Sequence, residues 1–207
     1  MTRSLPIAIY YEHPNWFRPL FAELDRRGLD YIRIDARCHQ YDPSRREPDY
    51  SLFFNRMSPS AYRRQPGGAV FYTLNLLTHL EALGVRVING HKAFTYEISK
   101  ALQAALLEQL SLPYPRAKVV SCAEDAARAA IDLRFPIVVK ANVGGSGAGI
   151  IRFDSMPALE LAIEQDQLDF GLDQTALVQE FIPSRGGYIT RIETLGGKYL
   201  YGIKVYS

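Results

Sequence analysis

Hydrophobic and polar positions in the first 90 residues alternate between two patterns. Compact apolar runs at 5–11, 31–34, 49–54 and 85–88 are typical of buried strands. Apolar residues at helical spacing occupy 16–24, and a second helical pattern follows 66–68. This alternation predicts a small open parallel sheet with helices on its faces. Ligands bind such sheets beyond the carboxyl ends of the strands, where the chain carries Tyr11, Glu12, His13, Asn55 and Arg56.

The next segment, 92–110, is predicted to form a single amphipathic helix. Apolar residues recur every fourth position from Phe94 to Leu110 and make one stripe. Lys100 lies two residues from both Ile98 and Leu102, or about 200° round a helix of 3.6 residues per turn. Lys100 is therefore predicted to point away from the core. Taken alone, a lysine in that position is a solvated surface charge.

A glycine-rich stretch at 135–153 is the strongest chemical signal in the chain. A short apolar strand ends at Lys140, and a second apolar run begins at Ile150. Glycine backbone can bring N–H groups close to an anion, and a strand-end lysine adds positive charge. The order strand, glycines, strand excludes a P-loop and a dinucleotide fingerprint. We predict a mobile β-hairpin lid over phosphates, and the alternative is an empty flexible turn. The lid residues are Gly144, Gly145, Ser146, Gly147 and Gly149.

The last third of the chain contains one further apolar strand and a hairpin. The strand covers 176–182 and is interrupted by Pro183. Two strands at 188–195 and 199–206 are joined by Gly196-Gly197-Lys198, a hairpin signal. The chain ends at Ser207, which we expect to lie in the middle of a sheet.

Composition narrows the classes of partner and the compartment. The 207 residues carry a net charge of +2, so no global field argues for nucleic acid or membrane binding. The two cysteines, Cys38 and Cys122, lack metal-type spacing and are expected to be reduced thiols. The N-terminus has no apolar stretch of signal-peptide or membrane length. We expect a cytoplasmic protein.

Taken in order, these elements resemble the ATP-grasp superfamily, and within it the RimK-type carboxylate–amine ligases. The resemblance implies an α/β chain in two parts. A small parallel pre-ATP-grasp (Rossmann-like) domain would cover 1–90. An ATP-grasp α+β domain would follow, its first, nucleotide-clasping subdomain at 91–182 and an incomplete second subdomain at 183–207.

The resemblance also assigns roles in nucleotide binding. Lys100 would reach the α/β-phosphates, and Lys140 would lie between the adenine and the phosphates. The glycine lid would cover the β/γ-phosphates. A hinge would pair its backbone with the adenine edge, and its residues are Gln179, Glu180, Phe181 and Ile182.

Arg191 and Lys204 are the catalytic residues that the resemblance implies, in contact with the triphosphate or an acyl phosphate. The sequence departs from the family pattern at two places here. RimK-type members commonly show Asp-x-Arg where this chain has Ile189-Thr190-Arg191. No carboxylate that could bind the ribose occurs in 183–186.

The implied reaction is phosphoryl transfer followed by acyl transfer. A substrate carboxylate would attack the γ-phosphate of ATP, and an amine or thiol would displace the resulting acyl phosphate. The cofactors would be ATP and Mg²⁺, with the metal ligands beyond Ser207, so the chain is expected to be a fragment that is inactive alone. The partners would be a small carboxylate and an amine substrate or a peptide, with a homo-oligomer left open. Two alternatives are a non-catalytic nucleotide-binding or regulatory module of the same fold and an unrelated α/β domain with an empty hairpin.

Overall fold

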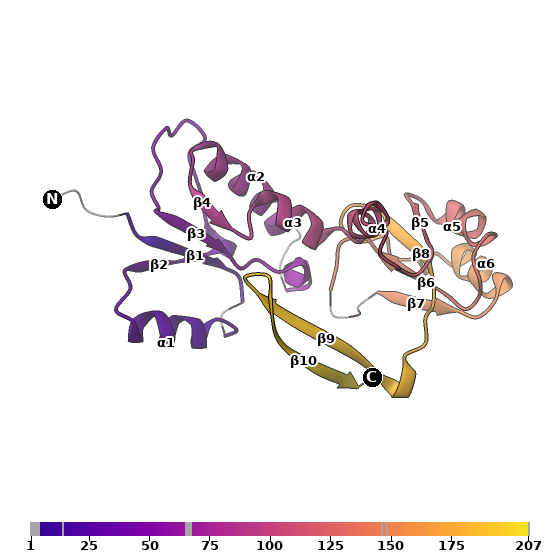
Figure 1. Ribbon diagram of the computed structural model, residues 1–207. Coiled ribbons are helices and arrows are strands. Elements are labelled where there is room, and N and C mark those ends of the chain that lie inside the picture. Colours follow the sequence, from indigo (N-terminus) through magenta and orange to yellow (C-terminus); the bar gives the residue numbers. More distant parts are fainter. Residues whose placement is uncertain (1–4, 14, 65–67, 146, 148, 207) are drawn as a thin grey trace.

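The computed structural model describes residues 5–13, 15–64, 68–145, 147 and 149–206, and these residues form a mixed α/β fold (Figure 1). The first sheet is parallel, with strand order β2-β1-β3-β4. Its strands are β1 (Ile7–Tyr11), β2 (Tyr31–Asp35), β3 (Leu52–Asn55) and β4 (Arg86–Ile88). The parallel sheet predicted for the first 90 residues is therefore confirmed.

Helices cover both faces of this sheet because successive strand residues point to opposite sides. Helix α1 (Arg18–Arg26) places Phe21 against Ile9 of β1 on one face. Helices α2 (Gly68–Ala82) and α3 (His91–Ile98) join a second core on the other face, which contains Tyr10 and Phe53. Two short 3₁₀ helices complete this part of the chain, η1 (Ala36–Cys38) and η2 (Pro59–Arg63).

The helix predicted over 92–110 is divided in two, so the expectation of one continuous helix was wrong. Helix α3 ends at Ile98, and α4 (Lys100–Gln109) begins after Ser99. Ser99 has extended backbone angles, and its side chain accepts a hydrogen bond from the Leu102 backbone N–H, as an N-cap does. The apolar stripe also changes at this point: Ile98 is buried, whereas Leu102 is 40% exposed.

The second sheet is antiparallel throughout, with strand order β5-β8-β6-β7. Its strands are β5 (Ala117–Val120), β6 (Ile137–Ala141), β7 (Ile150–Phe153) and β8 (Ala176–Glu180). Helices α5 (Ala123–Ala130) and α6 (Met156–Glu164) pack on one face through a core that includes Val139 and Val178. On the opposite face, Val138 and Leu177 are buried, whereas Val119 is 52% exposed.

A two-stranded hairpin follows the second sheet (Figure 1). After η3 (Arg185–Gly187), strands β9 (Tyr188–Leu195) and β10 (Lys198–Tyr206) pair in antiparallel register, as the sequence predicts. Large apolar side chains on both strands are exposed, among them Ile192 at 65% and Tyr199 at 70%. In the described part of the chain, no helix has the length and apolar character needed to cross a membrane.

Candidate functional site: a paired-lysine face beneath a glycine hairpin

Lys140 lies on the face of the second sheet that the helices leave free. Val139 and Ala141 alternate with Lys140 along β6, and Val139 packs into the helix-covered core. The register pairs Lys140 with Leu177, and Val138 with both Gln179 and Arg152. Because paired residues of antiparallel strands share a face, Gln179 and Arg152 project to the same side as Lys140.

Lys100 approaches the same region from the first turn of α4. Its Nζ donates hydrogen bonds to the backbone carbonyls of Ala141 (3.0 Å), Asn142 (2.9 Å) and Gly144 (3.3 Å). Lys100 is thus half-buried against the end of β6 and the root of the glycine loop. The outward, solvated position predicted from a continuous helix was wrong, because the break at Ser99 resets the direction of the side chains that follow.

A polar network that the sequence analysis missed holds this arrangement. The Asn142 side chain accepts hydrogen bonds from the Ala101 backbone N–H (2.8 Å) and Ser99 Oγ (3.1 Å), and it donates to Asp173 Oδ2 (2.6 Å). Among the described residues, Asp173 Oδ1 is buried without a hydrogen-bond partner. The network ties the start of α4 to the end of β6. A polar residue two positions after Lys140, at the end of the strand, was the available signal for Asn142, whereas Asp173 had none.

Both lysines have a lowered pKa. Burial lowers the pKa of Lys140. Burial also lowers the pKa of Lys100, the charge of Lys140 lowers it further, and Asp173 opposes the shift. Two lysines that repel one another at a partly buried site are stabilised when an anion binds between them. The electrostatics therefore favour a ligand with several negative charges.

The lowered pKa values predict that ATP binding depends on pH in the alkaline range. The charged form of each lysine is lost as pH rises through its lowered pKa, so ATP affinity should fall before the ordinary lysine pKa of about 10.4 is reached. Lys140→Arg keeps its charge over this range and should give a shallower decline. Dissociation constants measured from about pH 7 to about pH 10 check this, and equal slopes for the two proteins would contradict it.

The glycine loop contacts η2 at its root and requires glycine near its tip. A Cβ atom on Gly144 would lie 3.3 Å from the Tyr62 hydroxyl oxygen, and one on Gly145 would lie 3.4 Å from Ser60 Cβ. Gly147 and Gly149 have φ angles of +72° and +67°, which L side chains rarely adopt. The root of the predicted lid therefore borders the first part of the chain. Ser146, also assigned to the lid, lies outside the described residues.

The segment assigned as an adenine hinge lies at the end of β8, and its two central side chains face opposite ways. Gln179 shares the face of Lys140, whereas Glu180 shares the face of Val178, toward the helices. Backbone N–H groups of Glu180 and Phe181 donate to the carbonyls of Arg116 and Pro136, both at 2.9 Å. Among the described residues, no backbone carbonyl accepts a hydrogen bond from the Ile182 N–H.

The Glu180 carboxylate is used inside the protein. It is 3% exposed and accepts hydrogen bonds from Arg134 Nη2 (2.8 Å), Nε (3.2 Å) and backbone N–H (3.2 Å). Arg116 Nη1 lies 3.8 Å away. These contacts tie the end of β8 to the start of β6. The Glu180 side chain therefore fixes the end of β8.

Glu180 should contribute to the acid sensitivity of folding. Arg134 holds the pKa of Glu180 below its usual range. A carboxylate with a lowered folded-state pKa stabilises the fold above its unfolded pKa of about 4.3 and loses that contribution as pH falls through the folded value. Glu180→Gln should therefore show a shallower loss of stability on acidification in urea denaturation. Glu160→Gln, at an exposed position on α6, is the control, and its stability should depend on pH as that of the parent protein does. If the stability of Glu180→Gln showed the same pH dependence as the parent protein, the proposed contribution of Glu180 would be refuted.

Arg191 and Lys204, the implied catalytic residues, are not brought together. Arg191 pairs with Ile203 across the hairpin, and Lys204 pairs with Thr190. Paired residues share a face and neighbouring residues alternate, so the two cations lie on opposite faces of the hairpin. Lys204 Nζ lies 4.4 Å from the centre of the Tyr188 ring. A ligand on one face of the hairpin would meet only one of them.

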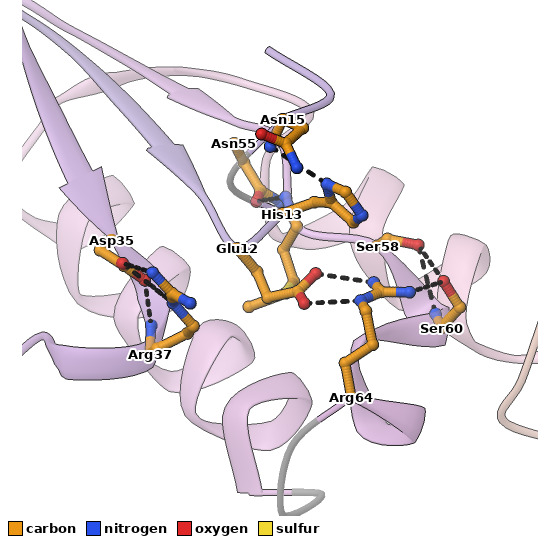
Figure 2. Close-up of polar contacts among 10 residues, drawn as sticks. Glu12, His13, Asn15, Asp35, Arg37, Asn55, Ser58, Ser60 and Arg64 are labelled. Carbon is orange, nitrogen blue, oxygen red and sulfur yellow. Dashed lines mark hydrogen bonds and ion pairs between the residues drawn. The ribbon is translucent and has the colours of Figure 1, made fainter. Parts of the chain in front are cut away.

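Charged side chains gather at the carboxyl ends of the parallel strands (Figure 2). Glu12 follows β1, is 3% exposed, and accepts hydrogen bonds from Arg64 Nε and Nη2, both at 2.7 Å. Arg64 Nη1 also donates to Ser60 Oγ at 3.2 Å, which links this edge to the helix bordering the glycine loop. Asp35 at the end of β2 is paired with Arg37.

Metal-ligating side chains are not clustered in the part of the chain that the structure describes. No group of three or more His, Cys, Asp or Glu side chains there could hold a metal ion. We therefore assign no Mg²⁺ ligand to these residues.

Comparison with known proteins identifies the architecture. No family model matches the chain. A probable alpha-L-glutamate ligase of Thioalkalivibrio sulfidiphilus is 30% identical over 129 residues, which are 62% of this chain and 42% of that protein. The chain thus matches less than half the length of this relative.

Solved structures match a larger share of the chain. The RimK domain ATP-grasp protein of Sphaerobacter thermophilus superposes with a TM-score of 0.74 at 20% identity, covering 96% of this chain and 72% of that one. An ATP-grasp ligase, PsnB, complexed with a precursor variant, Mg and ADP, superposes with a TM-score of 0.60 at 16% identity, covering 97% and 72%. The fold is that of the ATP-grasp ligases.

The chain is thus similar in sequence to probable alpha-L-glutamate ligases and similar in fold to a RimK domain ATP-grasp protein. The predicted fold class is confirmed.

Proposed function

We propose that the chain is the nucleotide-binding part of an ATP-dependent ligase that joins a carboxylate to an amine or thiol. The observation that carries the proposal is the pair Lys100 and Lys140, which come from different elements and interact electrostatically at the root of the glycine loop. The Ile182 N–H of the predicted hinge has no backbone partner among the described residues. The domain division at 90 and 182 belongs to the same proposal.

In this mechanism Lys140 and Lys100 neutralise the phosphates, and the glycine hairpin supplies backbone N–H groups over them. Gln179 and the Ile182 N–H recognise the adenine edge. Phosphoryl transfer depends mainly on positioning and charge neutralisation, so these groups need no side-chain nucleophile. A substrate carboxylate attacks the γ-phosphate, ADP leaves, and the amine displaces phosphate from the acyl phosphate. Mg²⁺ supplies further charge neutralisation on the phosphates when bound.

The names of the relatives suggest the substrate. The curated relatives are described as probable alpha-L-glutamate ligases. We propose L-glutamate as the first amino acid to test, as either the carboxylate or the amine component.

Two measurements on the full chain test the proposal. Isothermal titration with ATP and Mg²⁺ should give saturable binding, and absence of binding would refute the nucleotide site. ADP release that requires both L-glutamate and a second amino acid or peptide would support ligation. Because the 207 residues are expected to be inactive alone, the release assay uses the full-length protein. ATP binding without ADP release by that protein would favour the alternative, a nucleotide-binding or regulatory module that does no ligation.

A further inference from the structure

Arg56 differs from the other arginines at the carboxyl edge of the parallel sheet. Arg37 and Arg64 are neutralised by Asp35 and Glu12. Arg56 directly follows β3, is exposed, and makes no ion pair with any described carboxylate. This edge therefore contains a cation that forms no ion pair with a described carboxylate, although its charge interacts with Glu97 of α3.

Aromatic rings hold the Arg56 guanidinium in place. Its Cζ lies 5.3 Å from the centre of the Phe17 ring and 5.4 Å from that of Phe54. In cation–π contacts of this kind the aromatic rings contact the face of the guanidinium or its carbon atom. These contacts reduce the conformational freedom of a long side chain. The N–H donors in the guanidinium plane remain for a planar, bidentate acceptor such as a carboxylate.

The backbone that carries Arg56 is also fixed. The Arg56 N–H donates to the Tyr10 carbonyl at 2.8 Å. The side chains of Asn55 and Asn89 each donate to the other's backbone carbonyl at 3.0 Å, joining the ends of β3 and β4. A binding group on such a support loses little additional freedom when a ligand arrives.

Arg56 lies on the same edge as the segment that meets the glycine lid. Helix η2 begins three residues after it, and Ser60 and Tyr62 of η2 border Gly145 and Gly144. The acidic group that interacts electrostatically with Arg56 is Glu97 of α3. Burial raises the pKa of Glu97, and the positive charge of Arg56 lowers it. The two side chains form no ion pair. Glu97 leaves the guanidinium unpaired.

We infer that Arg56 binds a carboxylate of the substrate, either that of a free amino acid or the terminal carboxylate of a peptide. The inference rests on the proposed ligase function and adds to it the residue that selects an acidic substrate. It assigns the carboxyl edge of the parallel sheet as the substrate side and the paired lysines as the nucleotide side.

Titration of the full chain, saturated with Mg²⁺ and an ATP analogue that cannot transfer its γ-phosphate, tests this role. The probes are L-glutamate, an alanine tripeptide ending in glutamate, and the same tripeptide with an amidated C-terminus. Arg56→Gln should weaken binding of whichever acidic probe the parent protein binds by at least about tenfold, because a hydrogen-bonded charge pair contributes about 1.5 to 3 kcal/mol. Arg56→Lys keeps the charge but loses the paired N–H donors of the guanidinium. Its affinity should lie between those of the parent protein and Arg56→Gln.

The control is Arg86→Gln. Arg86 opens β4 and is exposed at the opposite, amino edge of the same sheet, so its loss should leave binding unchanged. L-glutamate separates a free amino acid from a peptide as the source of the carboxylate, and the amidated peptide should bind weakly to all variants. Unchanged affinity in Arg56→Gln, or no binding of either acidic probe by the parent protein with the nucleotide bound, would overturn the inference. Failure of the nucleotide to bind would instead refute the proposed function.

Discussion

Replacing Lys140 with alanine is expected to weaken ATP binding between about 10-fold and about 100-fold, the effect of removing one charge-assisted hydrogen bond of about 1.5 to 3 kcal/mol. Lys140 projects from β6 onto the open face of the antiparallel sheet, where burial has already removed part of its hydration. The substitution also removes the charge that repels Lys100. The measured change in ATP affinity therefore combines the lost contact of Lys140 with the relief of this repulsion. Isothermal titration with ATP and Mg²⁺ measures it.

The second sheet provides a matched control. Lys118 on β5 pairs with Val178, so it lies on the helix-covered face, and it forms a surface ion pair with Asp132 at 3.2 Å. Lys118→Ala should bind ATP as the parent protein does. Equal loss in both variants would indicate a general charge effect and would remove the support for a nucleotide site at Lys140.

Replacing Asn142 with alanine is expected to lower the free energy of unfolding by about 3 kcal/mol. Asn142 is 6% exposed, and its side chain bonds to Ser99, the Ala101 N–H and Asp173. Each buried polar partner left unsatisfied costs about 1 to 3 kcal/mol, with some recovery by local rearrangement. The same change frees the first turn of α4, so ATP affinity should fall as well.

Chemical denaturation of the full chain measures the stability effect. Asn75→Ala is the control, because Asn75 lies exposed on α2 and should tolerate the change with little loss. If Asn142→Ala proved as stable as Asn75→Ala, the network would not be a structural element of the site.

Local pattern was sufficient to predict much of the fold. Apolar runs of strand length with helical stripes between them gave the parallel sheet, because periods of 2 and 3.6 differ clearly over short segments. The glycine hairpin was found for a related reason: two β-branched runs flank a stretch where Gly147 and Gly149 adopt positive φ angles. Lys140 could be placed at the end of its strand because the chain turns directly after it.

Contacts between distant segments could not be predicted in this way. The four-residue apolar spacing continues across Ser99, so it hides the break that turns Lys100 toward the site; the break depends partly on Asn142, 43 residues further along. The direction of Glu180 depends on which face of β8 the helices cover. The face assignment that separates Arg191 from Lys204 needs the hairpin register, because both residues look equivalent in the linear sequence.

Next to Glu12 and Arg64 at the carboxyl edge lies a tryptophan that can serve as an internal optical reporter. Trp16 is the only tryptophan in the sequence. The His13 ring stacks on it at 4.1 Å, and Arg64 Cζ lies 5.0 Å from its centre while Glu12 holds the guanidinium. The emission of a single indole in such surroundings depends on the positions of both neighbours. We therefore expect ligand binding at this edge to change the intrinsic fluorescence of Trp16, which can be measured without a label.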